Sequence, residues 1–247
     1  MDLGWLEVSL AVQDLGRTVG FYEALGFRVA SRADKGMSAV LQGGNCRLAL
    51  YQGVLGPAET QLIFWQGDVE GCATSLAEAG IEVVQPLQAR DNGDASLMFR
   101  DPDGQLSYVI REQGETMVMP PEAEADLDRG VFQLSLPVKD LATTVAFYER
   151  LGFRNGDKKP EERVLAMSNG RDRICLYQGH LDPAELQLIF WQGDIDAVAD
   201  AARREGLSFL REPGRDAAGA GFMLKDPDGR PLFFITMGKY EKADFAV

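Results

Sequence analysis

The stretch QLIFWQGD at residues 61–68 occurs a second time, unchanged, at residues 187–194. The sequence on either side repeats as well. FYEALGF at residues 21–27 returns as FYERLGF at residues 147–153, and the tetrapeptide DPDG at 101–104 returns at 226–229. Matches in the same order around an identical octapeptide indicate a duplication. The sequence therefore predicts two similar domains in one chain.

Each half of the chain divides again into two similar pieces. Residues 8–12 alternate between apolar and polar, as a strand does, and Asp14 is a good N-cap for a helix that Gly26 would end. Further strands are expected near residues 37–41 and 47–51. The same order then restarts at the octapeptide. Residues 61–65 form a strand, Asp68 caps a helix that ends at Gly80, and strands follow near residues 82–84, 96–100 and 106–111. The DPDG sequence suits the hairpin turn between the last two strands.

The sequence thus predicts an α+β fold of four βαβββ modules, two in each domain, with curved mixed sheets and helices on their outer faces. We place the first domain at residues 1–112 and the second at residues 130–247. Residues 113–129 contain two adjacent prolines and an acidic run, which cannot build a core, and we expect a linker there.

Composition narrows the possible partners. The chain has 247 residues and a net charge of −13, which disfavours nucleic acid and anionic membranes and is compatible with a cationic ligand. The N-terminal residues lack the basic and apolar regions of a signal peptide, so we expect a cytoplasmic protein. The three cysteines, Cys46, Cys72 and Cys175, have no CxxC spacing and predict neither a disulfide framework nor a structural zinc site.

The ordered motifs resemble those of the vicinal oxygen chelate superfamily, which includes glyoxalases, bleomycin-resistance proteins and extradiol dioxygenases. Its marks are Val-x-Asp before a helix that carries Phe-Tyr and ends in Leu-Gly-Phe, and a later Asp-Pro-Asp-Gly. They stand here at residues 12–14, 21–27 and 101–104, and again at 138–140, 147–153 and 226–229. The resemblance covers almost the whole chain outside the linker. It is specific for the fold rather than for one reaction, because one fold hosts many chemistries.

Members of this family that are enzymes usually hold one divalent metal in each cleft, between histidine and carboxylate ligands. The resemblance carries the ligand positions onto Glu7, Ala49, Gln61 and Tyr108 in the first domain. In the second domain it carries them onto Gln133, Cys175, Gln187 and Phe233. A cleft that combined modules of both domains would draw on the same residues and would not give a better set of metal ligands. We therefore predict no metal site and no cofactor.

With a metal discounted, the same strand positions become the lining of an apolar, aromatic cleft for a small molecule. Glu7 and Tyr108 are the candidate catalytic groups, should the protein be an enzyme. His180, the only histidine, is expected in a loop and without a role. The predicted ligand-binding residues are Glu7, Ser9, Gln61, Ile63, Trp65, Tyr108, Gln133, Ser135, Gln187, Ile189, Trp191 and Phe233.

The leading hypothesis is a metal-free protein that binds a cationic or aromatic drug or metabolite, as the bleomycin-resistance branch of the family does. One alternative is a glyoxalase-type lyase or a dioxygenase with an atypical metal site. Another is a degenerate scaffold whose clefts mediate subunit contacts. Two paired domains in one chain already resemble the family's dimer, so we expect a monomer or a homodimer. Whether each cleft forms within one domain or between the two is left open by the sequence.

Overall fold

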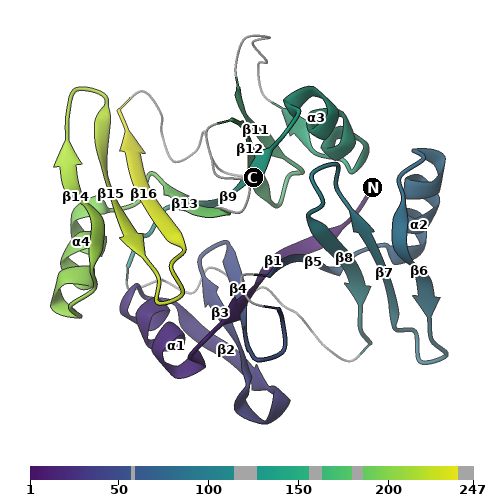
Figure 1. Ribbon diagram of the computed structural model, residues 1–247, viewed down its shortest axis with the longest axis horizontal. Helices are drawn as coiled ribbons and strands as arrows, with labels where there is room; N and C mark the ends of the chain where they lie inside the picture. The colour runs from purple at the N-terminus through teal and green to yellow at the C-terminus, as the bar shows by residue number, and fades with distance from the viewer. Residues whose placement is uncertain (57–58, 114–126, 156–162, 180–185, 239–247) are drawn as a thin grey trace.

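The computed structural model describes residues 1–56, 59–113, 127–155, 163–179 and 186–238 (Figure 1). Most of the predicted linker, and His180, lie outside these residues. In the first half the strands are β1 (Gly4–Val12), β2 (Arg28–Ala33), β3 (Ser38–Gly43), β4 (Cys46–Gln52), β5 (Thr60–Gln66), β6 (Val83–Ala89), β7 (Ala95–Arg100) and β8 (Leu106–Arg111). The helices are α1 (Leu15–Ala24) and α2 (Val69–Glu78), with a short 3₁₀ turn at Asp34–Gly36.

The second half repeats this order. Its strands are β9 (Val131–Val138), β10 (Arg154–Asn155), β11 (Val164–Ser168), β12 (Arg173–Gln178), β13 (Gln187–Trp191), β14 (Phe209–Arg215), β15 (Gly219–Lys225) and β16 (Pro231–Met237). Its helices are α3 (Leu141–Arg150) and α4 (Ile195–Arg204). The βαβββ modules of the sequence prediction are therefore confirmed as the building blocks of an α+β fold.

Each half forms one curved, mixed sheet of eight strands. The order in the first sheet is β2-β3-β4-β1-β5-β8-β7-β6, and the second sheet has the equivalent order β10-β11-β12-β9-β13-β16-β15-β14. The two modules of the first sheet meet where β1 pairs antiparallel with β5. On the outer sides of this pair, β4 runs parallel to β1 and β8 runs parallel to β5. Both modules of one half thus contribute strands to the same sheet.

The helix boundaries follow the predicted capping residues. The side chain of Asp14 accepts a hydrogen bond from the backbone N–H of Arg17 at the start of α1, and Asp68 does the same for Gly71 in α2. Beyond the two helix ends, Gly26 and Gly80 adopt positive φ angles of 79° and 64°, which glycine reaches without strain.

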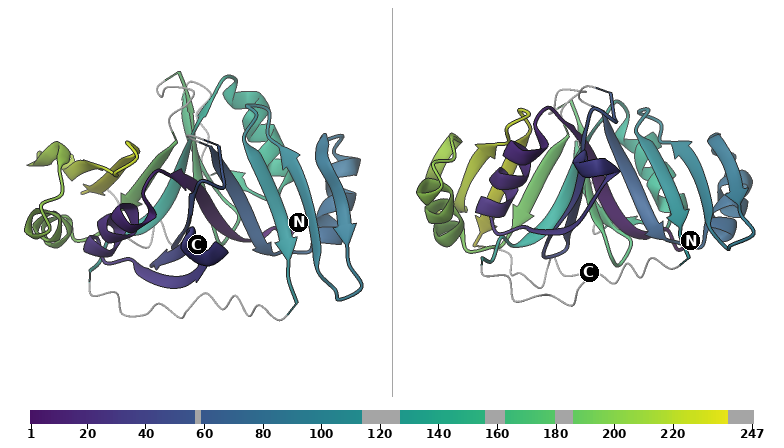
Figure 2. Two further views of the ribbon diagram at one scale, coloured as in Figure 1. Left: turned by 60° about the horizontal axis from the view of Figure 1, so that its bottom comes forward. Right: turned by 90° about the horizontal axis from the view of Figure 1, so that it is seen from below.

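The two halves are joined by helices that pack against the opposite half. Tyr22 of α1 donates a hydrogen bond from its hydroxyl to Asp226 in the β15–β16 turn, at 3.2 Å. Tyr148 of α3 donates equivalently to Asp101 in the β7–β8 turn, at 3.1 Å. Figure 2 shows this near-symmetry, with α1 beside the yellow strands of the second half and α3 beside the blue-green strands of the first.

The hydrophobic core reflects the same crossing. The ring of Phe27 lies 6.1 Å from that of Phe190, and Phe99 lies at the same distance from Phe147. One connected cluster of buried hydrophobic side chains includes residues of both halves. Neither half therefore has a core that is separate from the other. No helix in the described part of the chain is long and apolar enough to cross a membrane.

Candidate functional site

The central strands present two different faces. Val8 and Leu10 of β1 belong to the hydrophobic core on the helix side of the sheet. Because side chains alternate along a strand, Glu7 and Ser9 point to the opposite, concave face. In the register of the sheet, Glu7 lies opposite Ile63, and Ser9 lies opposite Gln61. The octapeptide that reveals the duplication therefore also lines this face.

All six site residues predicted in the first half share this concave face. Ile63 pairs in turn with Tyr108 on β8, and Trp65 lies two residues further along β5. The second sheet repeats the arrangement, with Gln133 opposite Ile189 and Ser135 opposite Gln187. The remaining two positions there are Trp191 on β13 and Phe233 on β16. The structure thus brings together each set of six residues, on two separate sheets.

Burial divides the first face into a floor and a rim. Glu7 is 1% exposed and Ser9 is fully buried, so both belong to the floor. Gln61, Trp65 and Tyr108 are half-buried and line the rim.

The floor holds an ion pair that the sequence prediction did not include. Arg47 on β4 donates from its Nε to Oε2 of Glu7 at 2.6 Å, with only 11% of the arginine side chain exposed. Arg47 stands two residues before Ala49 and so shares the concave face with it. The sequence did contain one indication of this residue, because an arginine also stands at the equivalent position of the second half, as Arg173.

Several polar atoms on this face have no hydrogen-bond partner among the described residues. They are Oε1 of Glu7, the hydroxyl of Ser9 and Nε1 of Trp65, all buried. A buried polar atom without a partner costs about 1–3 kcal/mol. These atoms offer one acceptor, one hydroxyl that can donate or accept, and one donor.

The rim residues Gln61 and Tyr108 have a common neighbour in Glu59. The Gln61 amide donates to the Glu59 carboxylate at 2.7 Å, and this hydrogen bond lowers the pKa of Glu59. Partial burial, and next the negative charge of Glu59, raise the pKa of the Tyr108 hydroxyl. Tyr108 is therefore protonated at neutral pH and can serve as a hydrogen-bond donor, but not as a base.

The concave face of the second sheet lacks the carboxylate at the equivalent position. Gln133 stands in place of Glu7 and is 2% exposed, and Gln187 is 7% exposed. Cys175 stands at a position where the family resemblance puts a metal ligand. Burial raises the pKa of its thiol to about 11, so the thiolate form that binds metals is disfavoured at neutral pH.

Neither set of positions offers the histidine and carboxylate donors that a divalent metal needs. In the first, the single carboxylate is already paired with a guanidinium, which would repel a metal cation at that oxygen. In the second, the donors are two neutral amides and a single buried thiol, with neither a carboxylate nor an imidazole. No group of three or more histidine, cysteine, aspartate or glutamate side chains in the described ranges is arranged to hold a metal. The residues present do not fit the metal that the family resemblance implies.

Comparison with solved structures finds the same fold in dioxygenases and in a glyoxalase. The model superposes on 2,2',3-trihydroxybiphenyl 1,2-dioxygenase from Sphingomonas wittichii with a TM-score of 0.66 and 19% identity, covering 94% of this chain and 89% of that one. The Mn(II)-bound glyoxalase from Novosphingobium aromaticivorans gives a TM-score of 0.64 with 16% identity, over 94% and 80% of the two chains. An extradiol ring-cleaving dioxygenase from B. fuscum gives 0.68 with 20% identity, over 97% and 72%.

These identities are low, so the structural matches establish the fold alone. No curated protein matches the sequence significantly. The family model named Glyoxalase/Bleomycin resistance protein/Dioxygenase superfamily matches residues 4–107 and again residues 130–232. Together the two matches cover most of the chain, on the two halves that the repeat defines. The chain belongs to the glyoxalase/bleomycin resistance protein/dioxygenase superfamily.

Proposed function

We propose that this protein binds a small aromatic molecule that carries hydroxyl groups, on the concave face of the first sheet and without a metal ion. The observation that carries the proposal is the ion pair between Glu7 and Arg47. It neutralises the only carboxylate at a family ligand position and leaves a polar floor without net charge.

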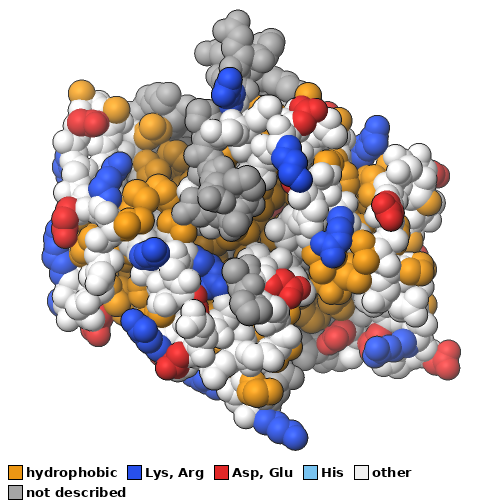
Figure 3. All heavy atoms as spheres, in the orientation of Figure 1, with side chains coloured by type: hydrophobic (Ala, Val, Ile, Leu, Met, Phe, Trp, Pro, Cys, Tyr) orange, Lys and Arg blue, Asp and Glu red, His pale blue; other side chains and the backbone are white. Residues whose placement is uncertain are grey.

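The charge of this floor bears on the kind of ligand. Although the whole chain carries a net charge of −13, Arg47 balances Glu7 at the site itself. On the face of the molecule seen in Figure 3, acidic and basic side chains are interspersed rather than gathered by sign. We therefore favour a neutral aromatic ligand over the cationic one with which the net charge of the chain is compatible.

The unpartnered atoms of the floor and rim suit hydroxyl groups. Oε1 of Glu7 would accept a hydrogen bond from one hydroxyl, and Nε1 of Trp65 would donate to the oxygen of another. Ile63 supplies an apolar surface between them, opposite Glu7 in the sheet. This combination of one apolar surface with a few directed polar groups is typical of small-molecule sites.

Binding is tested with 2,2',3-trihydroxybiphenyl, the compound in the name of one structural neighbour. The protein is titrated under anaerobic conditions with EDTA present, and binding is followed by tryptophan fluorescence and calorimetry. We expect saturable binding that does not require metal. Ser9→Ala should weaken it, because one hydroxyl partner is lost. Ser107→Ala is the matched control, since Ser107 is equally buried but belongs to the helix side of the same sheet.

The enzyme alternative is tested on the same samples. The protein is incubated with nickel, zinc, manganese or ferrous iron, desalted and analysed for retained metal. We expect less than stoichiometric retention. Stoichiometric metal that is lost in Glu7→Ala, or binding of the trihydroxybiphenyl only after metal loading, would overturn the metal-free proposal. Ring cleavage or lyase turnover by the loaded protein would then support the enzyme alternative.

A further inference from the structure

The duplication creates two equivalent contacts between the halves, and their hydrogen bonds are almost identical. In the β15–β16 turn, Oδ1 of Asp226 accepts from the backbone N–H groups of Asp228 and Arg230, at 3.0 and 2.8 Å. In the β7–β8 turn, Oδ1 of Asp101 accepts from the equivalent two N–H groups, at 2.9 and 2.8 Å. Oδ2 of each aspartate accepts from the tyrosine of the helix that packs against it.

The second aspartate of each turn also makes matching contacts. Asp228 accepts from the backbone N–H of Gln13 at 2.7 Å and from the Thr18 hydroxyl at 2.8 Å. Asp103 accepts from the backbone N–H of Lys139 and from the Thr144 hydroxyl, both at 2.7 Å. Because the two contacts match so closely, a difference between them at one residue can be recognised by comparing them.

One residue breaks this symmetry. The guanidinium of Arg230 donates to Oδ2 of Asp226 at 3.1 Å, lies 3.7 Å from Oδ2 of Asp228, and donates across the contact to the carbonyl of Ala11. Its side chain is only 13% exposed, so it fills the space between the turn and β1.

Glutamine replaces this arginine in the other contact. The Gln105 amide turns back onto the first sheet and donates to the carbonyls of Thr60 and Leu106, at 3.0 and 3.1 Å. Asp101 consequently has no ion-pair partner among the described residues, although it is only 6% exposed. Desolvation by this burial raises the pKa of its carboxyl, which agrees with a missing cation.

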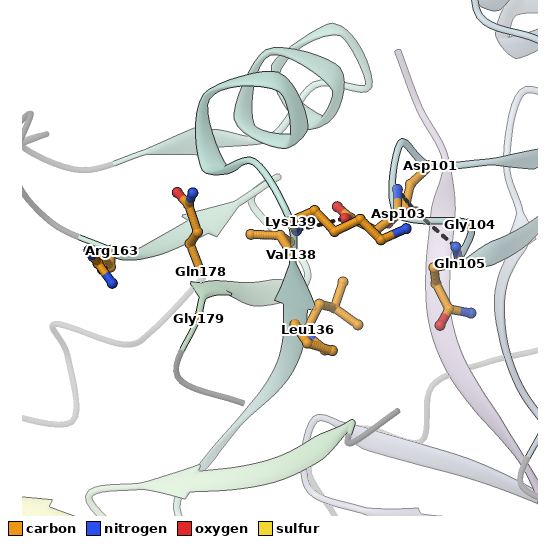
Figure 4. A pocket seen from close by; sticks show the side chains of 11 residues that line it. Asp101, Asp103, Gly104, Gln105, Leu136, Val138, Lys139, Arg163, Gln178 and Gly179 are labelled. Atoms are coloured by element: carbon orange, nitrogen blue, oxygen red, sulfur yellow. Dashed lines mark hydrogen bonds between the residues drawn. The ribbon is translucent and has the colours of Figure 1, made fainter. Parts of the chain in front are cut away.

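The space that Arg230 fills in one contact is open in the other. A cavity of about 680 Å³ lies between the β7–β8 turn and β9, with Asp101, Asp103 and Gln105 on one side. Lys139, Arg163 and Gln178 line the rest of it. In Figure 4 the Lys139 side chain extends towards the turn, and Arg163 lies at the opposite end of the cavity.

We propose that this cavity binds a small molecule with a guanidinium group at one end and a carboxylate at the other. The guanidinium would lie against Asp101 and Asp103, as that of Arg230 lies against Asp226 and Asp228, with the Lys139 ammonium turned from this turn towards the carboxylate of the ligand. The carboxylate would lie towards Arg163, whose equivalent in the other contact is the uncharged Met37. The site is independent of the concave face, since neither Glu7 nor Trp65 lines it.

The probe is L-arginine, titrated into the full-length protein by calorimetry and by thermal shift. We expect one bound equivalent and a rise in the melting temperature. L-Citrulline, which has a urea in place of the guanidinium, should bind at least about tenfold more weakly because it lacks the charge-assisted hydrogen bonds. Agmatine, which replaces the carboxylate end by hydrogen, should also bind more weakly than L-arginine. Equal binding of all three compounds, or no binding of L-arginine, would overturn the proposal.

Two reciprocal variants place the binding in this cavity. Gln105→Arg gives the open contact the arginine of the closed one and should abolish L-arginine binding while raising stability. Arg230→Gln opens the closed contact, and should lower the melting temperature and let L-arginine restore part of the loss. Unchanged L-arginine binding in Gln105→Arg would place the ligand elsewhere and refute the assignment. Both variants should bind trihydroxybiphenyl as the wild type does. A failure of L-arginine binding would then leave the proposal for the concave face unaffected.

Discussion

Removal of Arg47 should destabilise the protein far more than removal of the whole ion pair. In Arg47→Met, the Glu7 carboxylate stays in the floor, 1% exposed, without the guanidinium that lies 2.6 Å away in the wild type. Breaking a buried ion pair by removing one partner costs about 3–5 kcal/mol. The melting temperature of a chain of this size should fall by about 2–4 °C for each kcal/mol lost.

The double variant Glu7→Gln/Arg47→Met removes the stranded charge. Gln133 shows that an amide is accommodated at the equivalent position of the second sheet, where it is 2% exposed. We therefore expect the double variant to lose only about 1–2 kcal/mol, the cost of an imperfectly bonded buried amide. Replacing Glu7 by Gln in the Arg47→Met background should then recover about 2–3 kcal/mol of unfolding free energy, measured by urea denaturation of the wild type, Arg47→Met and the double variant.

Two outcomes of these measurements would contradict the prediction. If Arg47→Met unfolds within about 1 kcal/mol of the wild type, the carboxylate is not held in a desolvated floor. If the double variant is no more stable than Arg47→Met, the loss comes from the packing of the arginine stem rather than from the charge of Glu7. Either result would remove the main support for a neutral, metal-free floor.

Three further predictions concern other parts of the fold. Burial raises the pKa of Asp172 to about 6, and its carboxylate accepts a hydrogen bond from the backbone N–H of Leu6. Because this folded-state pKa lies above the unfolded value of 3.8, the contribution of Asp172 is most favourable below about pH 4 and is lost as the pH rises through 6. Asp172→Asn should therefore flatten the dependence of unfolding free energy on pH between 4 and 7, and an unchanged slope would contradict this origin. Gly4→Ala should prevent folding or cost several kcal/mol, because a Cβ there would lie 1.9 Å from the carbonyl oxygen of Trp65 and the backbone has a φ of 88°. Gly80→Ala, at a φ of 64° with open space around the added Cβ, should cost only about 1 kcal/mol. Thermal denaturation of the two variants measures both losses. Glu70→Gln breaks a bidentate but exposed pair with Arg111 and should cost less than about 1 kcal/mol, with the difference shrinking in high salt.

The sequence predicted the fold well where the pattern of side chains is decided locally. The helix caps Asp14 and Asp68 and the DPDG hairpins are signals of short range, and the structure has them at the predicted residues. Strand β2 had no such signal. Nearly all of its side chains are exposed, so Arg28–Ala33 shows no apolar alternation, although it pairs with β3.

The site was predicted less completely, because its decisive contacts join residues that are distant in sequence. The concave face could be inferred from alternation along each strand. The Glu7–Arg47 pair depends on which strands become neighbours, and the parallel pairing of β1 with β4 is not visible in either strand alone. Arg230 and Gln105 occupy equivalent places after the repeated tetrapeptide, but their different contacts depend on how the helices of one half pack against the other.

Because each helix packs against the opposite half, the chain has two equivalent contacts that could diverge separately after duplication. In a symmetric dimer of identical one-domain chains, both contacts would carry the same side chains, and any substitution would appear in both at once. Covalent fusion removes that constraint. One contact can keep Arg230 and hold the halves together, while the other, with Gln105, is free to acquire a ligand. In a fused chain one contact can therefore stabilise the fold while the other binds a ligand, which the two identical contacts of a symmetric dimer do not allow.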